Sequence, residues 1–258
     1  MKFTIAQILQ LYEAEAHKHG LEGTSTIQDM RTRRLEVRAL FGYLRDGLKV
    51  LEIGCGNGYV AEAVVRAFAV DLDALDFSAD MVRLARSRSL DGARGRIQFR
   101  QQDVLTLDVV EAYDVIFSER CIQNLETWDD QKRALGSISA ALKPSGRYIM
   151  LESFWTGLDN LNAARAEVDL QAIPESWHNR FLVEPDTRSF MASQGCECVE
   201  QNCFLSGYYF GSRVLLPAMM PPGREVTSRS ILNDFFVALP PSGDFCPIKI
   251  LVFQRADQ

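Results

Sequence analysis

Hydrophobic positions in the first part of the chain follow two spacings in turn. Apolar side chains recur at helical intervals over residues 4–17 and 27–44, and a short apolar run follows at residues 49–53. Strand and helix patterns then alternate. We predict strands over residues 49–53, 69–76, 96–102, 113–118 and 147–152, with helices over residues 60–68, 79–88 and 129–142. Because such alternation builds a parallel sheet covered on both faces, right-handed crossovers make this sheet doubly wound.

The alternation stops after residue 152. Residues 153–183 are rich in Trp, Asn and Arg and show only modest helical periodicity, around residues 158–170. Strand patterns at residues 196–204 and 247–254 enclose an aromatic, proline-rich insertion, residues 205–245, of the kind that often lines a site. We therefore predict an α/β fold with a doubly wound, mostly parallel seven-stranded sheet, N-terminal helices and a cap inserted late in the chain.

Length and composition favour one domain over residues 1–258. Within it we expect four parts: an N-terminal helical lid, a core for cofactor binding, a cap that forms the substrate region, and a last strand. Their predicted boundaries are residues 1–47, 48–152, 153–246 and 247–258.

The charge balance argues against a nucleic-acid partner. The chain has 28 basic and 34 acidic side chains, a formal net charge of -6, so no overall positive field attracts a phosphate backbone. Four arginines gather before the first strand, but Glu36 interrupts them, and their spacing favours the solvated face of a helix: Arg31, Arg33, Arg34 and Arg38.

Neither the N-terminus nor any later apolar run predicts a targeting or membrane segment. The first residues turn acidic too early for a signal peptide, and no run has the length of a membrane span. Six cysteines show no C-x-x-C spacing, so we expect reduced thiols, no metal site and a cytoplasmic protein. We expect a monomer or a homodimer with no membrane partner.

A glycine-rich turn follows the first strand, at Gly54, Gly56 and Gly58. Glycine allows the backbone to approach a ligand closely, and the N-terminus of the next helix offers free N–H groups. A dinucleotide site would place its third glycine one residue later, where this chain has Tyr59. A dehydrogenase is therefore the disfavoured rival.

With Glu52 before it, this turn resembles the first motif of the class I S-adenosylmethionine-dependent methyltransferases. In that family, the resemblance implies, the acidic residue at the strand end orients the amino group of the methionine part. The glycine backbone meets the carboxylate of the same ligand.

Four later segments extend the resemblance over residues 48–152, about two fifths of the chain. Asp76, with Ser78 and Met81, looks like the ribose-binding segment, although Asp71 and Asp73 compete for that role. Residues 101–104 resemble the adenine-binding segment, residues 119–125 the segment beside the transferred methyl, and residues 142–151 a family turn and strand. The resemblance implies S-adenosyl-L-methionine as cofactor and these binding residues: Glu52, Gly54, Cys55, Gly56, Asn57, Asp76, Phe77, Met81, Asp103, Val104 and Glu119.

The acceptor site must come from the less recognisable segments. His178 is the only histidine outside the N-terminal helix, so it is a candidate general base or, equally, a hydrogen-bonding residue of the cap. Glu119 and Arg120 form either a polar contact for substrate or a surface ion pair. Aromatic residues with one cation suit a flat or anionic acceptor, while core burial is their simpler role. The candidate substrate residues are Asn124, Trp155, Trp177, Tyr208, Tyr209 and Arg213.

The same segments are loosely similar to bacterial small-molecule methyltransferases. We expect methyl transfer to a small-molecule acceptor, with oxygen favoured and nitrogen or carbon open. The alternatives are a protein or RNA methyltransferase, a non-catalytic protein that binds S-adenosylmethionine, and a cofactor-assisted cyclisation or rearrangement.

Overall fold

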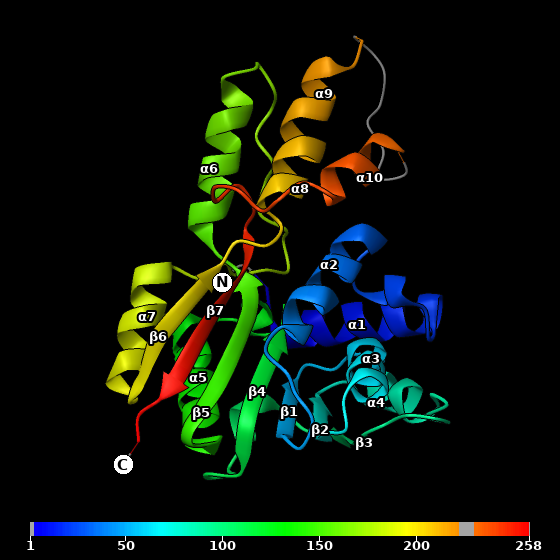
Figure 1. The fold of residues 1–258 in the computed structure, drawn as a ribbon, viewed down its shortest axis with the longest axis vertical. Coiled ribbons are helices and arrows are strands. Elements are labelled where there is room, and N and C mark those ends of the chain that lie inside the picture. Colours follow the sequence, from blue (N-terminus) through cyan, green and yellow to red (C-terminus); the bar gives the residue numbers. More distant parts are fainter. Residues whose placement is uncertain (1–2, 222–229, 258) are drawn as a thin grey trace.

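A seven-stranded sheet forms the centre of the computed structural model, which describes residues 3–221 and 230–257 (Figure 1). Its strand order is β3-β2-β1-β4-β5-β7-β6, and only β7 runs antiparallel to its neighbours. The predicted mostly parallel α/β sheet is confirmed. The strands are β1 (Lys49–Ile53), β2 (Asp71–Asp76), β3 (Arg96–Gln101), β4 (Tyr113–Glu119), β5 (Leu142–Ser153), β6 (Cys196–Asn202) and β7 (Ile248–Arg255).

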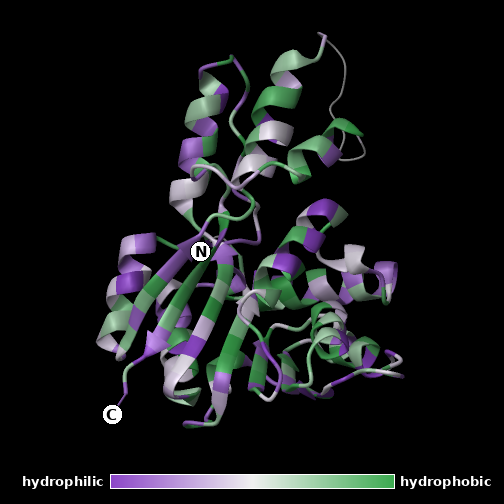
Figure 2. Ribbon diagram, viewed as in Figure 1, coloured by the Kyte–Doolittle hydropathy of each residue, from purple (hydrophilic) through white to green (hydrophobic). Residues whose placement is uncertain are grey.

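Successive strand residues point to opposite sides of the sheet, and both sides carry apolar side chains. Helices therefore cover both faces. Val50 packs into one apolar cluster with α2 (Met30–Phe41), α3 (Tyr59–Ala67) and α4 (Ala79–Arg86). Leu51 packs into the other, with α5 (Trp128–Ala141) and α7 (Glu184–Ser193). Figure 2 shows hydrophobic residues along the central strands, as expected of strands buried on both faces.

The cap rises beyond the carboxyl ends of the parallel strands (Figure 1). It consists of α6 (Trp155–Ala166), α8 (Ser206–Phe210), a π-helical turn (Gly211–Leu215), α9 (Leu216–Met219) and α10 (Leu232–Val237). Separately, α1 (Ile5–His19) lies across the same edge of the sheet beside α2. No helix in the described ranges has both the length and the apolar character required to cross a membrane.

Several boundaries differ from the predicted ones. Helix α2 starts at Met30, because the side chain of Asp29 accepts hydrogen bonds from the Arg31 and Thr32 N–H groups as an N-cap. Helix α7 was not predicted: it buries only Thr187 and Met191, so its sequence carries a weak amphipathic signal. Strand β5 begins at Leu142, ahead of the predicted Arg147.

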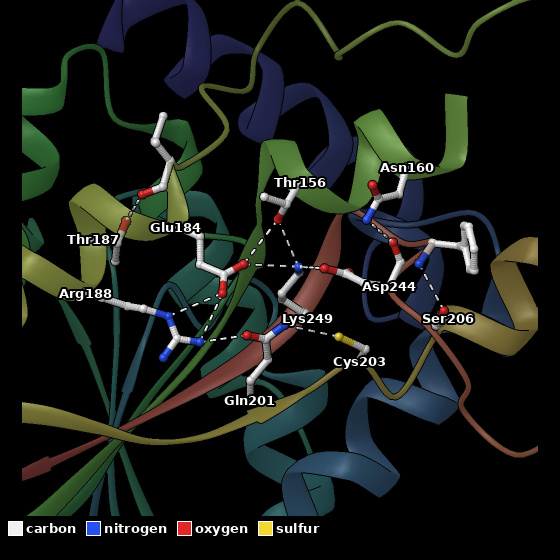
Figure 3. Close-up of polar contacts among 12 residues, drawn as sticks. Thr156, Asn160, Glu184, Thr187, Arg188, Gln201, Cys203, Ser206, Asp244 and Lys249 are labelled. Carbon is white, nitrogen blue, oxygen red and sulfur yellow. Dashed lines mark hydrogen bonds and ion pairs between the residues drawn. The ribbon is translucent and has the colours of Figure 1, made fainter. Parts of the chain in front are cut away.

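A buried lysine joins the cap to the sheet (Figure 3). The side chain of Lys249 on β7 is fully buried, and its Nζ forms ion pairs with Glu184 of α7 and Asp244. It also donates to Thr156 Oγ1 of α6 at 3.0 Å. Arg188 forms a second ion pair with Glu184 at 3.0 Å. Because Thr156, Glu184 and Asp244 all contact one ammonium group, Lys249 holds the first turn of α6 next to the sheet.

We predict that Lys249→Met lowers the free energy of unfolding by about 1–3 kcal/mol, because it removes the fully buried cation that the half-buried carboxylates of Glu184 and Asp244 share. Chemical denaturation followed by circular dichroism measures this change. The matched control is Lys132→Met, which removes an ion pair with the exposed Asp129 and should cost about 0.5 kcal/mol or less. Equal costs for the two variants would contradict the role of Lys249.

Candidate functional site

A cavity lies at the carboxyl edge of the sheet, between the loops after β1, β2, β3 and β4 and the lid helices α1 and α2. Its empty volume is about 970 Å³, open solvent at its mouth included. Ligands of open α/β sheets bind at this edge. Of the predicted cofactor-binding residues, ten line the cavity: Glu52, Gly54, Cys55, Gly56, Asn57, Asp76, Phe77, Asp103, Val104 and Glu119.

The glycine turn has a backbone that other residues adopt with difficulty. Gly54 and Gly56 have φ values of 77° and 52°. A Cβ atom on Gly54 would also lie 2.6 Å from the side chain of Cys121. The turn is held to β2, since Gly54 N and Cys55 N both donate to the Leu75 carbonyl at 2.8 Å.

Glu52 lies one residue before the end of β1, and one oxygen of its carboxyl group lacks a hydrogen-bond partner in the described part of the chain. The residue is 2% exposed, and its Oε2 accepts no hydrogen bond from any described residue. Burial, and the nearby charge of Glu119, raise the pKa of Glu52 well above its ordinary value. A buried acceptor beside a cavity fits a ligand that brings its own donor.

Asp76 ends β2 and connects it to the glycine turn. Its Oδ2 accepts from Gly56 N at 2.7 Å and its Oδ1 from Ser78 N at 2.9 Å. Burial raises the pKa of Asp76 to about 6, although these N–H groups oppose the rise. The competing aspartates lie elsewhere: Asp71 is exposed, and Asp73 accepts from Tyr113 Oη.

Asp103 follows β3 and caps a short 3-10 helix, where its Oδ1 accepts from Leu105 N at 2.9 Å. Its neighbours Gln102 and Val104 also line the cavity. Among the predicted cofactor-binding residues, Met81 does not line the cavity. Its side chain is fully buried as part of α4, so contact with a ligand remains an untested prediction.

Helix α1 covers the cavity, which Ile5, Ile8 and Tyr12 line from above. Tyr12 Oη donates to Asn124 Oδ1 at 2.8 Å, and Asn124 Nδ2 donates to the His178 carbonyl at 3.0 Å. Asn124 thereby connects the lid to the segment that leads into α7. Sequence periodicity predicted the helix, but the partner of its apolar stripe depends on tertiary packing.

Three buried charged side chains and the half-buried Arg120 lie between the lid and β4. Arg33 of α2 forms ion pairs with Glu119 and, more distantly, with Glu36, while Arg120 Nε lies 3.2 Å from Glu36. Burial raises the pKa of Glu36 to about 8, against the charge of Arg120. Burial also opposes ionisation of Glu119, yet Arg33 and Arg120 hold its pKa below the usual value.

This cluster corrects two interpretations of the sequence. Arg34 and Arg38 are exposed on the predicted solvated face, but Arg33 is only 5% exposed and lines the cavity. Glu119 and Arg120 form a buried group with the lid rather than a surface pair. No local pattern predicts these partners, because Arg33 and Glu119 are 86 residues apart.

A second carboxylate shapes the segment after β4. Glu152 of β5 is fully buried, and it accepts from Ser118 Oγ at 2.6 Å and from the N–H groups of Cys121, Ile122 and Gln123. Burial raises the pKa of Glu152 to about 7, against these hydrogen bonds. Glu152 thus fixes the backbone that presents Cys121, Asn124 and Leu125 to the cavity.

Comparison with known proteins agrees with this geometry. Residues 50–146 match the family model described as a methyltransferase domain. Phosphoethanolamine N-methyltransferase 2 of Caenorhabditis elegans is 29% identical over 45% of this chain, but only 26% of its own length is covered. A ubiquinone biosynthesis O-methyltransferase of Haemophilus ducreyi is 26% identical over 64% of this chain and 70% of its own.

The fold is also similar to that of a solved methyltransferase. Magnesium protoporphyrin IX methyltransferase from Synechocystis PCC 6803, solved with bound S-adenosylhomocysteine, superposes with a TM-score of 0.63 over 98% of this chain and 100% of its own, at 15% identity. Residues 50–146 of the chain therefore carry a methyltransferase domain, and the fold is that of S-adenosylmethionine-dependent methyltransferases.

The cavity of this methyltransferase domain fits its cofactor. The unpartnered Glu52 oxygen suits the ammonium group of the methionine part, and the open glycine turn suits its carboxylate. Asp76 keeps lone pairs for ribose hydroxyls beside its two backbone contacts. These residue roles remain predictions. In the described ranges no group of His, Cys, Asp and Glu side chains has the arrangement of a metal site.

Among the predicted acceptor residues of the methyltransferase domain, only Asn124 lines the cofactor cavity. Tyr208 and Tyr209 are buried, and Arg213 stacks on the Tyr209 ring at 3.6 Å, while Tyr208 Oη donates to Asp29 Oδ2. These contacts join the cap to α2. His178, Trp155 and Trp177 also lie outside the cavity lining, so their substrate roles stay predictions.

We predict that Asp76→Ala weakens S-adenosylhomocysteine binding by about 1.5–3 kcal/mol, since it removes a charged acceptor for the ribose hydroxyls. Isothermal titration calorimetry measures the affinity. Asp71→Asn, at the other end of the same strand, is the control and should leave it unchanged. An unaltered affinity in Asp76→Ala would refute the assignment.

We also predict that S-adenosylhomocysteine affinity falls as the pH drops through about 6, the pKa of Asp76 in the free protein. Hydroxyl donors favour the charged carboxylate, so binding lowers this pKa and protonation competes with the ligand. Titrations between about pH 8 and pH 5 measure the effect, which should be several-fold. In Asp76→Asn this part of the pH dependence should vanish. The same slope in both proteins would assign it to another group.

Proposed function

We propose that this chain transfers a methyl group from S-adenosylmethionine to a small-molecule acceptor, with oxygen as the favoured atom. The observation that carries the proposal is the buried carboxyl group of Glu52, which meets the glycine turn and Asp76 in one cavity under α1. The ubiquinone biosynthesis O-methyltransferases among the relatives support oxygen, and the acidic chain supports an acceptor other than nucleic acid.

In the proposed reaction, the cofactor supplies an electrophilic methyl group on a sulfonium. A lone pair of the acceptor oxygen forms the bond to the methyl carbon, the carbon–sulfur bond breaks, and its electron pair stays on sulfur. The residues around the cavity contribute orientation and exclusion of water. Ile5, Ile8 and Leu125 give the cavity an apolar cover.

The acceptor proton must also leave. No histidine of the described chain lines the cofactor cavity, so a role for His178 as general base requires the acceptor to reach beyond Asn124. Asn124 contacts the His178 carbonyl at 3.0 Å, which places the backbone of His178 next to the cavity wall. His178 therefore stays the candidate base within the proposal.

The test is turnover. The purified chain is incubated with S-adenosylmethionine and a panel of phenols, catechols, alcohols and amines, and mass spectrometry detects a product heavier by one methylene with equimolar S-adenosylhomocysteine. Methylation of a phenol or alcohol supports the proposal. Methylation of bulk RNA or peptide instead would favour the alternative substrates. Cofactor binding without product on any acceptor would overturn the enzymatic assignment.

For an acceptor found in this panel, we predict that His178→Ala spares S-adenosylhomocysteine affinity and slows turnover by about 100-fold. The loss should be smaller for a more acidic acceptor, which needs less help from a base. His17→Ala, at a side chain 71% exposed on α1, is the matched control. Wild-type turnover in His178→Ala would limit His178 to hydrogen bonding within the cap.

A further inference from the structure

A second cavity lies beside the cofactor cavity and shares none of its lining residues. It is formed by the first turns of α5, α6 and α7 together with residues from the segment 175–183. Its empty volume is about 660 Å³, open solvent at its mouth included, a size that suits a small organic molecule.

Aromatic side chains form the walls of this second cavity. Trp128 packs edge-on against Phe190 with ring centroids 6.2 Å apart, and Trp155 packs against Phe181 at 5.6 Å. Trp155 is nevertheless 37% exposed, and Val183 at the same wall is 45% exposed. Large apolar side chains left open around a cavity favour a flat ring as the ligand.

The charged groups of the second cavity have both signs. The Arg180 guanidinium lines it together with the carboxylates of Glu175 and Asp186. An ion of either sign would therefore meet a like charge. A neutral polar substituent that both donates and accepts hydrogen bonds suits this mixture. Arg180 Nε already donates to the Glu126 carbonyl at 2.7 Å, whereas its terminal nitrogens donate to no described residue.

The wall between the two cavities is the segment 122–126. From the side of the second cavity, Gln131 Nε2 donates to the Ile122 carbonyl at 3.1 Å and Arg180 N donates to the Gln123 carbonyl at 2.6 Å. From the other side, Asn124 and Leu125 line the cofactor cavity. Residues that would touch a ligand in the second cavity therefore hold the backbone of a segment that lines the cofactor cavity.

We propose that the second cavity binds a neutral, flat aromatic molecule with a polar substituent, and that its occupation is coupled to the cofactor cavity through the segment 122–126. The binding part stands independently of the proposed reaction. Coupling requires a difference in ligand affinity between two arrangements of this segment, and it acts equally in both directions.

The test uses three probes of equal ring size: benzamide, benzoate and benzylamine, which are neutral, anionic and cationic. The chain has three tryptophans, and Trp128 and Trp155 line the second cavity while none lines the cofactor cavity. Tryptophan fluorescence and ligand-observed NMR therefore report binding directly. We expect benzamide to bind most tightly and to remain bound in saturating S-adenosylhomocysteine.

Two variants locate the site. Trp155→Ala removes a wall, and Val183→Phe fills the cavity from an exposed position without removing a packed ring. Each should weaken benzamide binding by about tenfold. Phe235→Ala, at an exposed side chain outside the lining of either cavity, is the control and should bind as the wild type does. Both cavity variants should retain wild-type S-adenosylhomocysteine affinity.

Displacement of benzamide by S-adenosylhomocysteine, tighter binding of either charged probe, or unchanged binding in both cavity variants would overturn the site. Saturating benzamide should shift the dissociation constant of S-adenosylhomocysteine about threefold in the wild type and leave it unshifted in Val183→Phe. The same constant with and without benzamide in the wild type would overturn the coupling. If S-adenosylhomocysteine itself fails to bind, the proposed function fails while the probe result stands.

Discussion

The hydrogen bond from Gly56 N to the Asp76 carboxylate is the interaction on which the cofactor cavity depends. It joins the ends of two adjacent parallel strands, and it requires a glycine turn whose backbone lies in the left-handed region. Burial makes the carboxylate costly, so backbone N–H groups must satisfy it. The result is a fixed acceptor at the point where the strands and the turn meet.

Buried charge recurs around this point and differs in how it is balanced. Glu119 is neutralised by Arg33 from the lid, and Glu152 by a hydroxyl and three backbone N–H groups. The Oε2 atom of Glu52 accepts no hydrogen bond in the described chain, and no ion pair holds this carboxyl group there. A donor from a ligand would therefore stabilise Glu52 more than the other two. The partners of Glu119 and Glu152 instead hold the lid and the segment after β4.

The segment after β4 connects these features. Glu152 holds its backbone from within the sheet, Tyr12 contacts it from the lid, and Gln131 and Arg180 hold it from the aromatic cavity. One short segment therefore meets the cofactor cavity, the lid and the second cavity. This position is the structural basis of the coupling that we propose between the two cavities.

The sequence by itself determined the alternating elements, the edge of the sheet at which the cavity lies, and ten of the cofactor-binding candidates that line it. These are local properties: an apolar strand, a glycine turn and a carboxylate at a strand end remain legible because they are adjacent in the chain. Only the tertiary structure decided that Arg33 pairs with Glu119, that Tyr208 and Arg213 join the cap to the start of α2, and that two tryptophans share a second cavity. Those contacts join residues far apart in the chain, and helical or strand periodicity states which face of an element is apolar but not which partner it meets.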